Sequence, residues 1–190
     1  MEQEYFEETF EKTDYKTEPL PRGEYEQCEF IACDFSNSSL EGSKFLSCRF
    51  TGCNLSMAKF SGSILTDAVF TDCKVLGVGF ETCNQFGLSM SFNSCNLNHA
   101  SFYQARLKKT QFRDSQFHEV DFTDCDLSNA VFMNCDLLRA VFQNTNLEKA
   151  DLRTSYNYTI DPERNRVKKA RFSLAGVTGL LSKYDLIIEQ

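Results

Sequence analysis

Cysteine and histidine are the residues of this sequence that could bind a metal ion, carry out redox chemistry or act as nucleophiles. The 190-residue chain has nine cysteines and two histidines, His99 and His118. No two cysteines form a C-x-x-C pair, so the ligand spacing of zinc and iron–sulfur sites is absent. We therefore expect no metal and no other cofactor. The cysteines are Cys28, Cys33, Cys48, Cys53, Cys73, Cys83, Cys95, Cys125 and Cys135.

The spacing of the cysteines indicates a structural role instead. From Cys125 to Thr154 the chain reads CDLSN AVFMN CDLLR AVFQN TNLEK ADLRT, which is six units of five residues. Each unit begins with a small residue and has Leu or Phe third, and all nine cysteines of the chain fall on the small position. A free cysteine in a core behaves as a small hydrophobic residue. We expect reduced, structural thiols, with Cys33, Cys53 and Cys73 in the core, as is typical of a reducing compartment.

Motifs of the common enzyme classes are absent. The sequence contains no G-x-S-x-G, no P-loop and no G-x-G-x-x-G that opens a helix. His99 and His118 fall on outward positions of the repeat, and no base–nucleophile pair accompanies them. The sequence therefore predicts a protein that is not an enzyme.

The five-residue period determines which side chains share a face. A period of five fits neither an amphipathic helix nor a half-buried strand. The pattern instead turns the small residue and the large residue two positions later inward, and the other three outward. If four units form the sides of a square, one coil takes 20 residues and side chains 20 apart stack. The large residues expected in the core include Phe112, Phe122, Phe132 and Phe142.

Two segments interrupt this period. Large residues recur every five positions from Tyr25 to Phe80 and again from Phe92, so residues 86–91 must contain a two-residue bulge. We expect Phe86 and Met90 to fill this layer from inside. A binding loop is the alternative, because bulges are over-represented near functional sites.

The second interruption, residues 153–169, preserves the spacing of 20 residues between Leu152 and Phe172. We expect one irregular coil here.

The two ends of the chain differ from the repeat region 25–177. Residues 1–24 contain Pro19 and Pro21 and read as a leader that lays a strand or partial coil over the first full turn as a cap. Residues 178–190 read as a short helix and a strand-like apolar tail at 185–189, which would serve as a cap or a dimer contact. No window is long and apolar enough for a membrane span, and residues 1–12 do not resemble a secretory signal. A cytoplasmic location is expected.

The charged residues are unevenly distributed. Residues 1–30 contain ten acidic and three basic residues, which accounts for the whole net charge of −7, and residues 31–190 contain 17 of each. Bases cluster at 106–113 and 164–171. These charges could be solvated surface residues of little energetic consequence, or they could contact a partner. The candidate partner surface is acidic: Asp114, Glu119, Asp121, Asp124, Asp126 and Asp136.

The repeat resembles that of pentapeptide-repeat proteins. This resemblance implies an all-β fold, a right-handed quadrilateral β-helix, here with a short C-terminal helix. The end of the chain resembles the quinolone-resistance group (Qnr, MfpA and McbG proteins) in having Asp161-Pro162, a last repeat at 170–177, Leu180-Leu181 and an apolar tail. In that group an acidic dimer mimics B-form DNA, binds type II topoisomerases and protects them from quinolones.

The resemblance implies a protein-binding rod whose partner is DNA gyrase or topoisomerase IV, with no direct nucleic-acid or membrane contact. It also implies a homodimer joined through the C-terminus. The alternative is a scaffold or adaptor that binds another protein and has no topoisomerase activity, since a DNA mimic needs negative charge along its length and residues 31–190 are neutral overall. The residues implied in the dimer contact are Leu180, Leu181, Tyr184 and Ile187.

Overall fold

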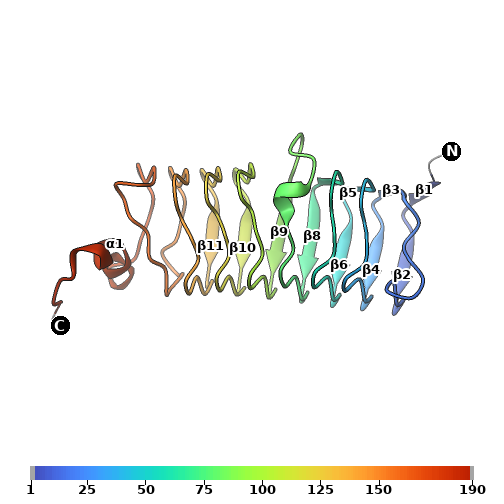
Figure 1. Cartoon of the computed structure of the whole chain (residues 1–190), viewed down its shortest axis with the longest axis horizontal. Helices are drawn as coiled ribbons and strands as arrows, with labels where there is room; N and C mark the ends of the chain where they lie inside the picture. The colour runs from blue at the N-terminus through green and yellow to red at the C-terminus, as the bar shows by residue number, and fades with distance from the viewer. Residues whose placement is uncertain (1–2, 189–190) are drawn as a thin grey trace.

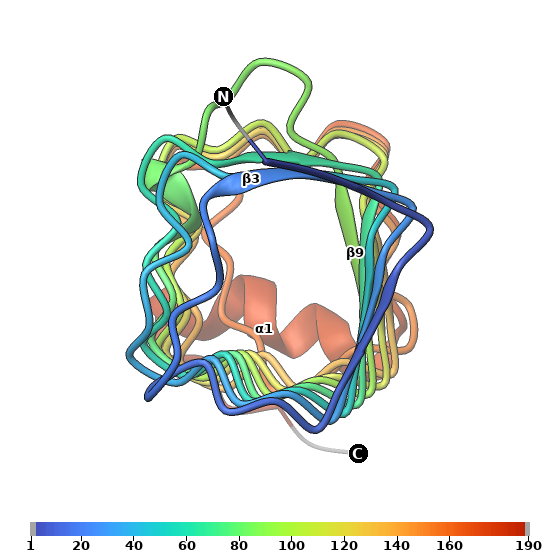
Figure 2. The same cartoon turned by 90° about the vertical axis from the view of Figure 1, so that its right-hand side faces the viewer.

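The computed structural model describes residues 3–188, which form a parallel β-solenoid. Its coils stack into a rod with the two chain ends at opposite ends (Figure 1). Seen along the axis, each coil is a square, and the chain runs clockwise as it recedes from the N-terminus (Figure 2). The fold is therefore the right-handed, four-sided β-helix expected from the sequence.

Two of the four sides contain regular strands. The first side is the sheet β1 (Gln3–Phe6), β3 (Gly23–Glu26), β5 (Lys44–Leu46) and β7 (Ile64–Thr66). The second side is the sheet β2 (Thr9–Glu11), β4 (Glu29–Ile31), β6 (Arg49–Thr51), β8 (Ala68–Thr71), β9 (Met90–Asn93), β10 (Gln111–Arg113) and β11 (Val131–Met133). The third and fourth sides are connected by isolated parallel bridges, such as Asn96 with Gln116 and Ser101 with Asp121.

The register between coils is 20 residues, as the repeat predicts. Tyr5 pairs with Tyr25 and Phe30 with Phe50. Residues 3–24 therefore form a coil of their own in the same register as the repeats that follow. At the interruption the register becomes 22 residues, since Phe70 pairs with Phe92, and from β9 onward it returns to 20.

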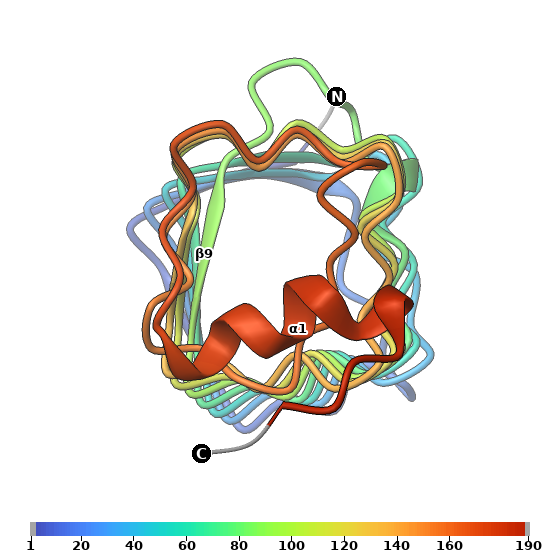
Figure 3. The ribbon, with the colours of Figure 1, turned by 90° about the vertical axis from the view of Figure 1, so that its left-hand side faces the viewer.

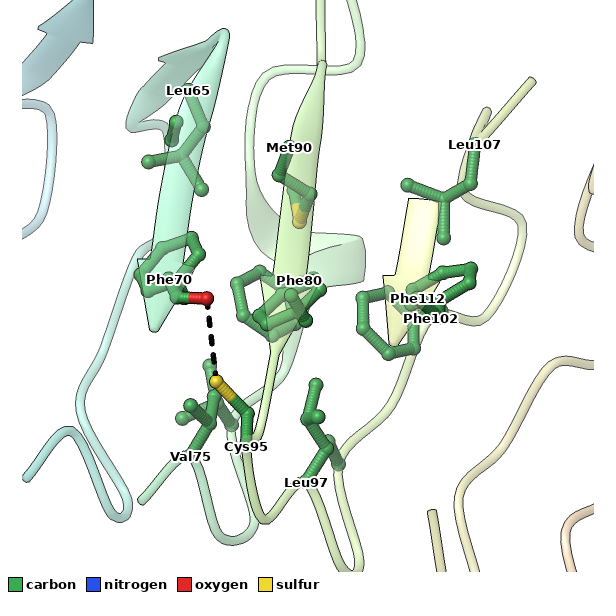
Figure 4. Close-up of a cluster of buried hydrophobic side chains, with 14 of the residues drawn as sticks. Leu65, Phe70, Val75, Phe80, Met90, Cys95, Leu97, Phe102, Leu107 and Phe112 are labelled. Carbon is green, nitrogen blue, oxygen red and sulfur yellow. Dashed lines mark hydrogen bonds between the residues drawn. The ribbon is translucent and has the colours of Figure 1, made fainter. Parts of the chain in front are cut away.

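Aromatic columns fill the interior. The ring of Phe112 stacks between those of Phe92 and Phe132, with centroid distances of 6.0 and 4.6 Å. Phe122 stacks on Phe142 at 5.2 Å in a neighbouring column. Figure 4 shows part of this core, where rings and aliphatic side chains from successive coils meet. Within residues 3–188 these buried side chains fill the interior of the coils.

Most corners of the square have a left-handed backbone conformation. Lys109 and Lys149, for example, have φ of 62° and 60°. The Lys109 amide donates to the carbonyl oxygen of Ser128 in the next coil at 3.0 Å, and that of Lys149 donates to Lys168 at the same distance. These inter-coil bonds offset the conformational cost of a positive φ, and they leave the corner side chains pointing outward in columns along the rod.

The interruption at 86–91 projects outward as a loop, shown in green in Figure 1. The expectation that Phe86 fills the interior is wrong, because its side chain is 91% exposed. The Asn84 side chain accepts a hydrogen bond from the Phe86 amide (2.9 Å), which forms a turn before Phe86. Gly87 has a φ of 73°, which forms a second turn after it, and the two turns leave Phe86 on the outside. Leu88 is buried instead.

Met90 fills the interior as expected. Its side chain is buried and lies between Leu65 and Leu107 (Figure 4).

The irregular coil keeps the register of the solenoid. Arg166 bridges Asn146 and Arg171 bridges Asp151, both 20 residues apart. Asn165 occupies an inward position and is buried, yet its side chain is satisfied. Its amide group donates to the Phe142 carbonyl (3.0 Å) and its oxygen accepts from the amide of the residue facing it, Thr145 (2.9 Å).

A helical segment crosses the C-terminal end of the rod (Figure 3). It consists of η2 (Ala175–Val177), α1 (Thr178–Leu181) and η3 (Ser182–Tyr184). A further short turn, η1 (Phe80–Thr82), lies before the loop. The segment can pack closely because residue 179 is a glycine: a Cβ at this position would lie 2.2 Å from the Tyr158 carbonyl oxygen. The strand-like tail does not form in residues 185–188, and Glu189 lies outside the described residues.

Replacing Phe112 by Ala should lower the free energy of unfolding by about 3–5 kcal/mol, because a cavity would open between two stacked rings. Guanidinium denaturation followed by circular dichroism measures this. Phe86→Ala is the matched control and should change stability by less than about 0.5 kcal/mol, because its ring is exposed. Equal effects of the two substitutions would contradict the assignment of Phe112 to the core.

Candidate functional site

The cysteines are placed for packing rather than chemistry. All nine are free and buried. Most of the thiols donate to carbonyl oxygens one coil away, as Cys53 does to Phe30 (3.2 Å) and Cys73 to Phe50 (3.3 Å). Burial raises the pKa of Cys48 and Cys135 to about 12. A thiol that stays protonated and covered is neither a nucleophile nor a metal ligand.

The histidines lie beside carboxylates on the third side and its corner. His118 Nε2 lies 2.8 Å from Asp136 Oδ2, and His99 Nδ1 lies 3.5 Å from Glu119 Oε2. Burial opposes ionisation of Asp136, but hydrogen bonds from His118 and Asn157 outweigh it and lower the pKa of this carboxyl group. Within residues 3–188 neither imidazole contacts a hydroxyl or thiol group, and no three His, Cys, Asp or Glu side chains gather in a way that could hold a metal ion.

The six acidic residues singled out from the sequence do not form one patch. Asp126 is on the first side, where it bridges Arg106, and Asp136 is on the third side, where it bridges Gln116. Asp121 is on the fourth side. The other three, Asp114, Glu119 and Asp124, occupy left-handed corners between sides. The acidic residues thus encircle the rod.

Most of these carboxylates bind a neighbouring coil. Asp114 accepts a hydrogen bond from Asn134 at 2.9 Å, and Asp126 lies 3.4 Å from Lys108 Nζ. Glu119 lies 3.3 Å from the Arg139 guanidinium. Their charge is partly neutralised within the protein, which leaves less of it for a partner.

The residues implied in a dimer contact are placed differently from one another. Leu180 packs against the core, and Leu181 is partly buried. Tyr184 donates a hydrogen bond to Glu163 (2.9 Å), while Ile187 is 91% exposed. Sequence reasoning did not single out two more exposed apolar residues just before this segment, Leu174 and Val177. In the apolar tail, Leu186 and Ile188 are also exposed.

The first side changes its charge along the rod. Near the N-terminus its outward side chains are acidic, with Glu4, Glu7, Glu24 and Glu26. Beyond the projecting loop they are mostly basic, and we call this group the basic face: Arg106, Lys108, Lys109, Lys149, Arg166, Lys168 and Lys169. Applying the 20-residue period to the outward positions would have assembled this group from the sequence, since positions such as 106, 126, 146 and 166 share one column.

The repeat assigns the chain to a family. A model described as "Pentapeptide repeat region" matches residues 43–115 and 75–152, which together are more than half of the chain. The chain belongs to the pentapeptide-repeat family. No curated protein matches the sequence significantly.

Similar solved structures include three of QnrB1, described as a plasmid-mediated fluoroquinolone resistance protein. Two trypsin-treated forms have TM-scores of 0.67 and 0.62 at 16% and 20% identity. The alignments cover 98% and 99% of this chain and 100% and 92% of the QnrB1 chains. The full-length form has a TM-score of 0.52 at 19% identity, with coverage of 97% of this chain and 100% of the other. At this identity the likeness shows a shared fold.

Pentapeptide-repeat proteins are generally structural or binding solenoids rather than enzymes. The filled interior agrees with this, since it directs contacts to the sides and ends of the rod. Among residues 3–188, no helix has the length and apolar character needed to cross a membrane.

The thiols should not react in the native protein. At pH 8 we expect no rapid modification by a disulfide reagent such as DTNB, because burial raises the pKa of thiols such as Cys48 and Cys135 to about 12 and the core covers them. All nine should react in guanidinium. Rapid native modification of even one thiol would contradict the structural role.

Proposed function

We propose that this protein is a Qnr-like rod that binds DNA gyrase or topoisomerase IV and protects the enzyme from quinolones. The observation that supports this is the likeness to QnrB1 over 98% of this chain and 100% of the QnrB1 chain. Such a protein acts by binding, and the cytoplasm, where both topoisomerases work, is the compartment we expect for a chain with nine free thiols.

The acidic N-terminal end is the part of the rod that suits a DNA-binding groove. Residues 1–30 carry the whole net charge of −7. Their exposed carboxylates include Glu7, Glu26 and Glu29 on two adjoining sides. A basic groove attracts such a surface over long distances. The basic face would be repelled from the same groove, so mimicry of DNA would be confined to the N-terminal coils.

A supercoiling assay with purified gyrase, with and without a fluoroquinolone, tests this proposal. We expect the protein to restore supercoiling in the presence of the drug, and to do so less well at high salt because salt screens exposed charges. Neutralising the acidic end should reduce protection more than neutralising three exposed carboxylates elsewhere. The test variant is Glu7→Gln/Glu26→Gln/Glu29→Gln and the control is Glu41→Gln/Asp72→Asn/Asp124→Asn.

Absence of both protection and inhibition at micromolar concentrations would reject gyrase as the partner. Protection that both triple variants retain would reject the acidic end as the contact. In the first case the alternative function, a scaffold or adaptor without topoisomerase activity, becomes the leading one. The overall charge balance favours it, because residues 31–190 have equal numbers of acidic and basic residues.

We further propose that the C-terminal end joins two copies of this chain. Leu174 and Ile187 are 92% and 91% exposed beside the helical segment, and Leu186 and Ile188 are also exposed. A two-fold contact would cover this apolar group on both copies at once. Leu180 supports the contact from below, since it packs against the core.

Charged substitutions at this end should produce monomers. Leu174→Asp/Ile187→Asp is expected to halve the mass measured by light scattering, because a carboxylate cannot be buried without a partner. Phe86→Asp is the matched control, since Phe86 is as exposed as Ile187 but lies far along the rod. A monomeric wild-type protein, or loss of the dimer in the control, would contradict this contact.

A further inference from the structure

The basic face has cations that are free to bind an anionic ligand. Asp126 bridges Arg106 on one side and Asn146 on the other, and Asn146 bridges Arg166, so these residues form one column. At about 4.8 Å per coil, the column is about 14 Å long. Among the described residues, ion pairs on this face engage Lys108, with Asp126 at 3.4 Å, and Arg166, with Glu148 at 2.8 Å. The remaining five basic side chains have no carboxylate partner there.

Two exposed aromatic rings lie near the N-terminal edge of this face. Phe86 belongs to the projecting loop, with 91% of its side chain exposed. Tyr103 is 40% exposed on the adjoining fourth side, just before the left-handed corner at Gln104 that leads to Arg106. The loop is attached to the coil that contains Arg106, because the Gln85 side-chain oxygen accepts a hydrogen bond from the Arg106 amide (3.3 Å). The Thr66 hydroxyl also donates to the Gly87 carbonyl (3.3 Å).

A groove of about 370 Å³ lies at the foot of the loop, between the first and second sides. Its lining includes Lys108, Lys109 and Gln111, all of which can donate hydrogen bonds to phosphate oxygens. The lining also includes the carboxylate of Asp67, which accepts a hydrogen bond from Ser89 Oγ at 2.9 Å. The two lysines leave the groove with a net positive charge.

We propose that the loop, the groove and the adjoining basic face form a binding surface for single-stranded nucleic acid. Cations that follow the backbone and aromatic rings that stack on unpaired bases are the two elements of such surfaces. Here Arg106, Lys108 and Lys109 contact phosphates, while Phe86 and Tyr103 stack on bases. The strand crosses the first side at the foot of the loop. One side spans about 16 Å, from five residues at about 3.3 Å each, so the surface holds a few nucleotides.

The proposal differs from the expectation, based on the resemblance, that the chain binds no nucleic acid. The whole-chain charge of −7 gives no sign of this face. The excess of acidic over basic residues lies entirely in residues 1–30, at the N-terminal end of the rod. An unpaired strand fits better than a duplex, since its bases are free to stack and the projecting loop obstructs a straight double helix. The exposed rings also favour it over an acidic polypeptide, which offers no bases for stacking.

Fluorescence anisotropy with a labelled oligothymidylate of roughly 15 nucleotides tests the proposal, a length at the upper end of known site sizes. With three phosphate contacts, affinity should fall about 20-fold between about 50 and 200 mM salt. Phe86→Ala should weaken binding about 5- to 150-fold, the range for loss of one stacked base. Lys108→Gln/Lys109→Gln should weaken binding and flatten the salt dependence.

Matched variants show whether a loss of binding is specific to this surface or follows from any loss of positive charge or of an exposed apolar side chain. Lys59→Gln/Lys74→Gln removes the same charge from exposed positions on other sides, and Leu174→Ala removes an equally exposed apolar side chain. Both should bind like the wild type, and thermal melting should show all four variants to be folded.

Three results would overturn the proposal. The first is no binding of the oligonucleotide at low salt, and the second is an equal loss in the matched variants. The third is that polyglutamate or a duplex of the same length competes for the protein as well as an unlabelled single strand does, and that the binding of this competitor is unchanged by Phe86→Ala. That result would assign the basic face to acidic proteins or to duplexes instead.

Discussion

Parallel hydrogen bonding between successive coils, in a register of 20 residues, is the constraint on which the rest of this structure depends. Because each coil lies directly on the one before, inward side chains meet their equivalents and form columns, such as Phe92, Phe112 and Phe132. The same bonds hold the corners in left-handed conformations. They also explain how an insertion is tolerated: two extra residues at 86–91 are expelled as a loop, and the strands on either side still pair, Phe70 with Phe92.

A rod built in this way has its functional surfaces on the outside. The interior is filled by rings and by buried thiols, so the sides, the loop and the two ends are what a partner can contact. These parts are chemically distinct. The N-terminal coils are acidic, the first side beyond the loop is basic, and the C-terminal end exposes apolar side chains such as Leu174 and Ile187. The three partners proposed above, a basic protein groove, an anionic strand and a second copy of the chain, would therefore each use a different surface.

Sequence reasoning succeeded where the repeat alone decides. The five-residue period predicted which repeat side chains turn inward and the register of the irregular coil at 153–169, and the resemblance to pentapeptide-repeat proteins implied the square coil. The expectation that Met90 fills the interior at the interruption is also confirmed. Sequence reasoning failed at Phe86. The large position after Phe80 falls on Gln85, and the next one, Phe92, follows seven residues later instead of five, so either Phe86 or Leu88 could have turned inward. The local turn decided between them, through the Asn84 side chain and the left-handed Gly87. It also grouped Asp121 with Asp126, which are neighbours in sequence but lie on different sides of the rod.

The sequence by itself determined the family and the inward or outward direction of most side chains, because each five-residue unit buries one small and one large residue. The coil was expected from the resemblance to that family. Only the tertiary structure decided which outward residues become neighbours. Residues one coil apart in the chain lie about 4.8 Å apart along the rod, whereas residues five apart lie around a corner. The acidic series therefore spreads around the rod, and the basic face forms from residues up to 63 positions apart, Arg106 to Lys169. Phe86 stands beside this face because the inter-coil register left no room for its loop within the stack.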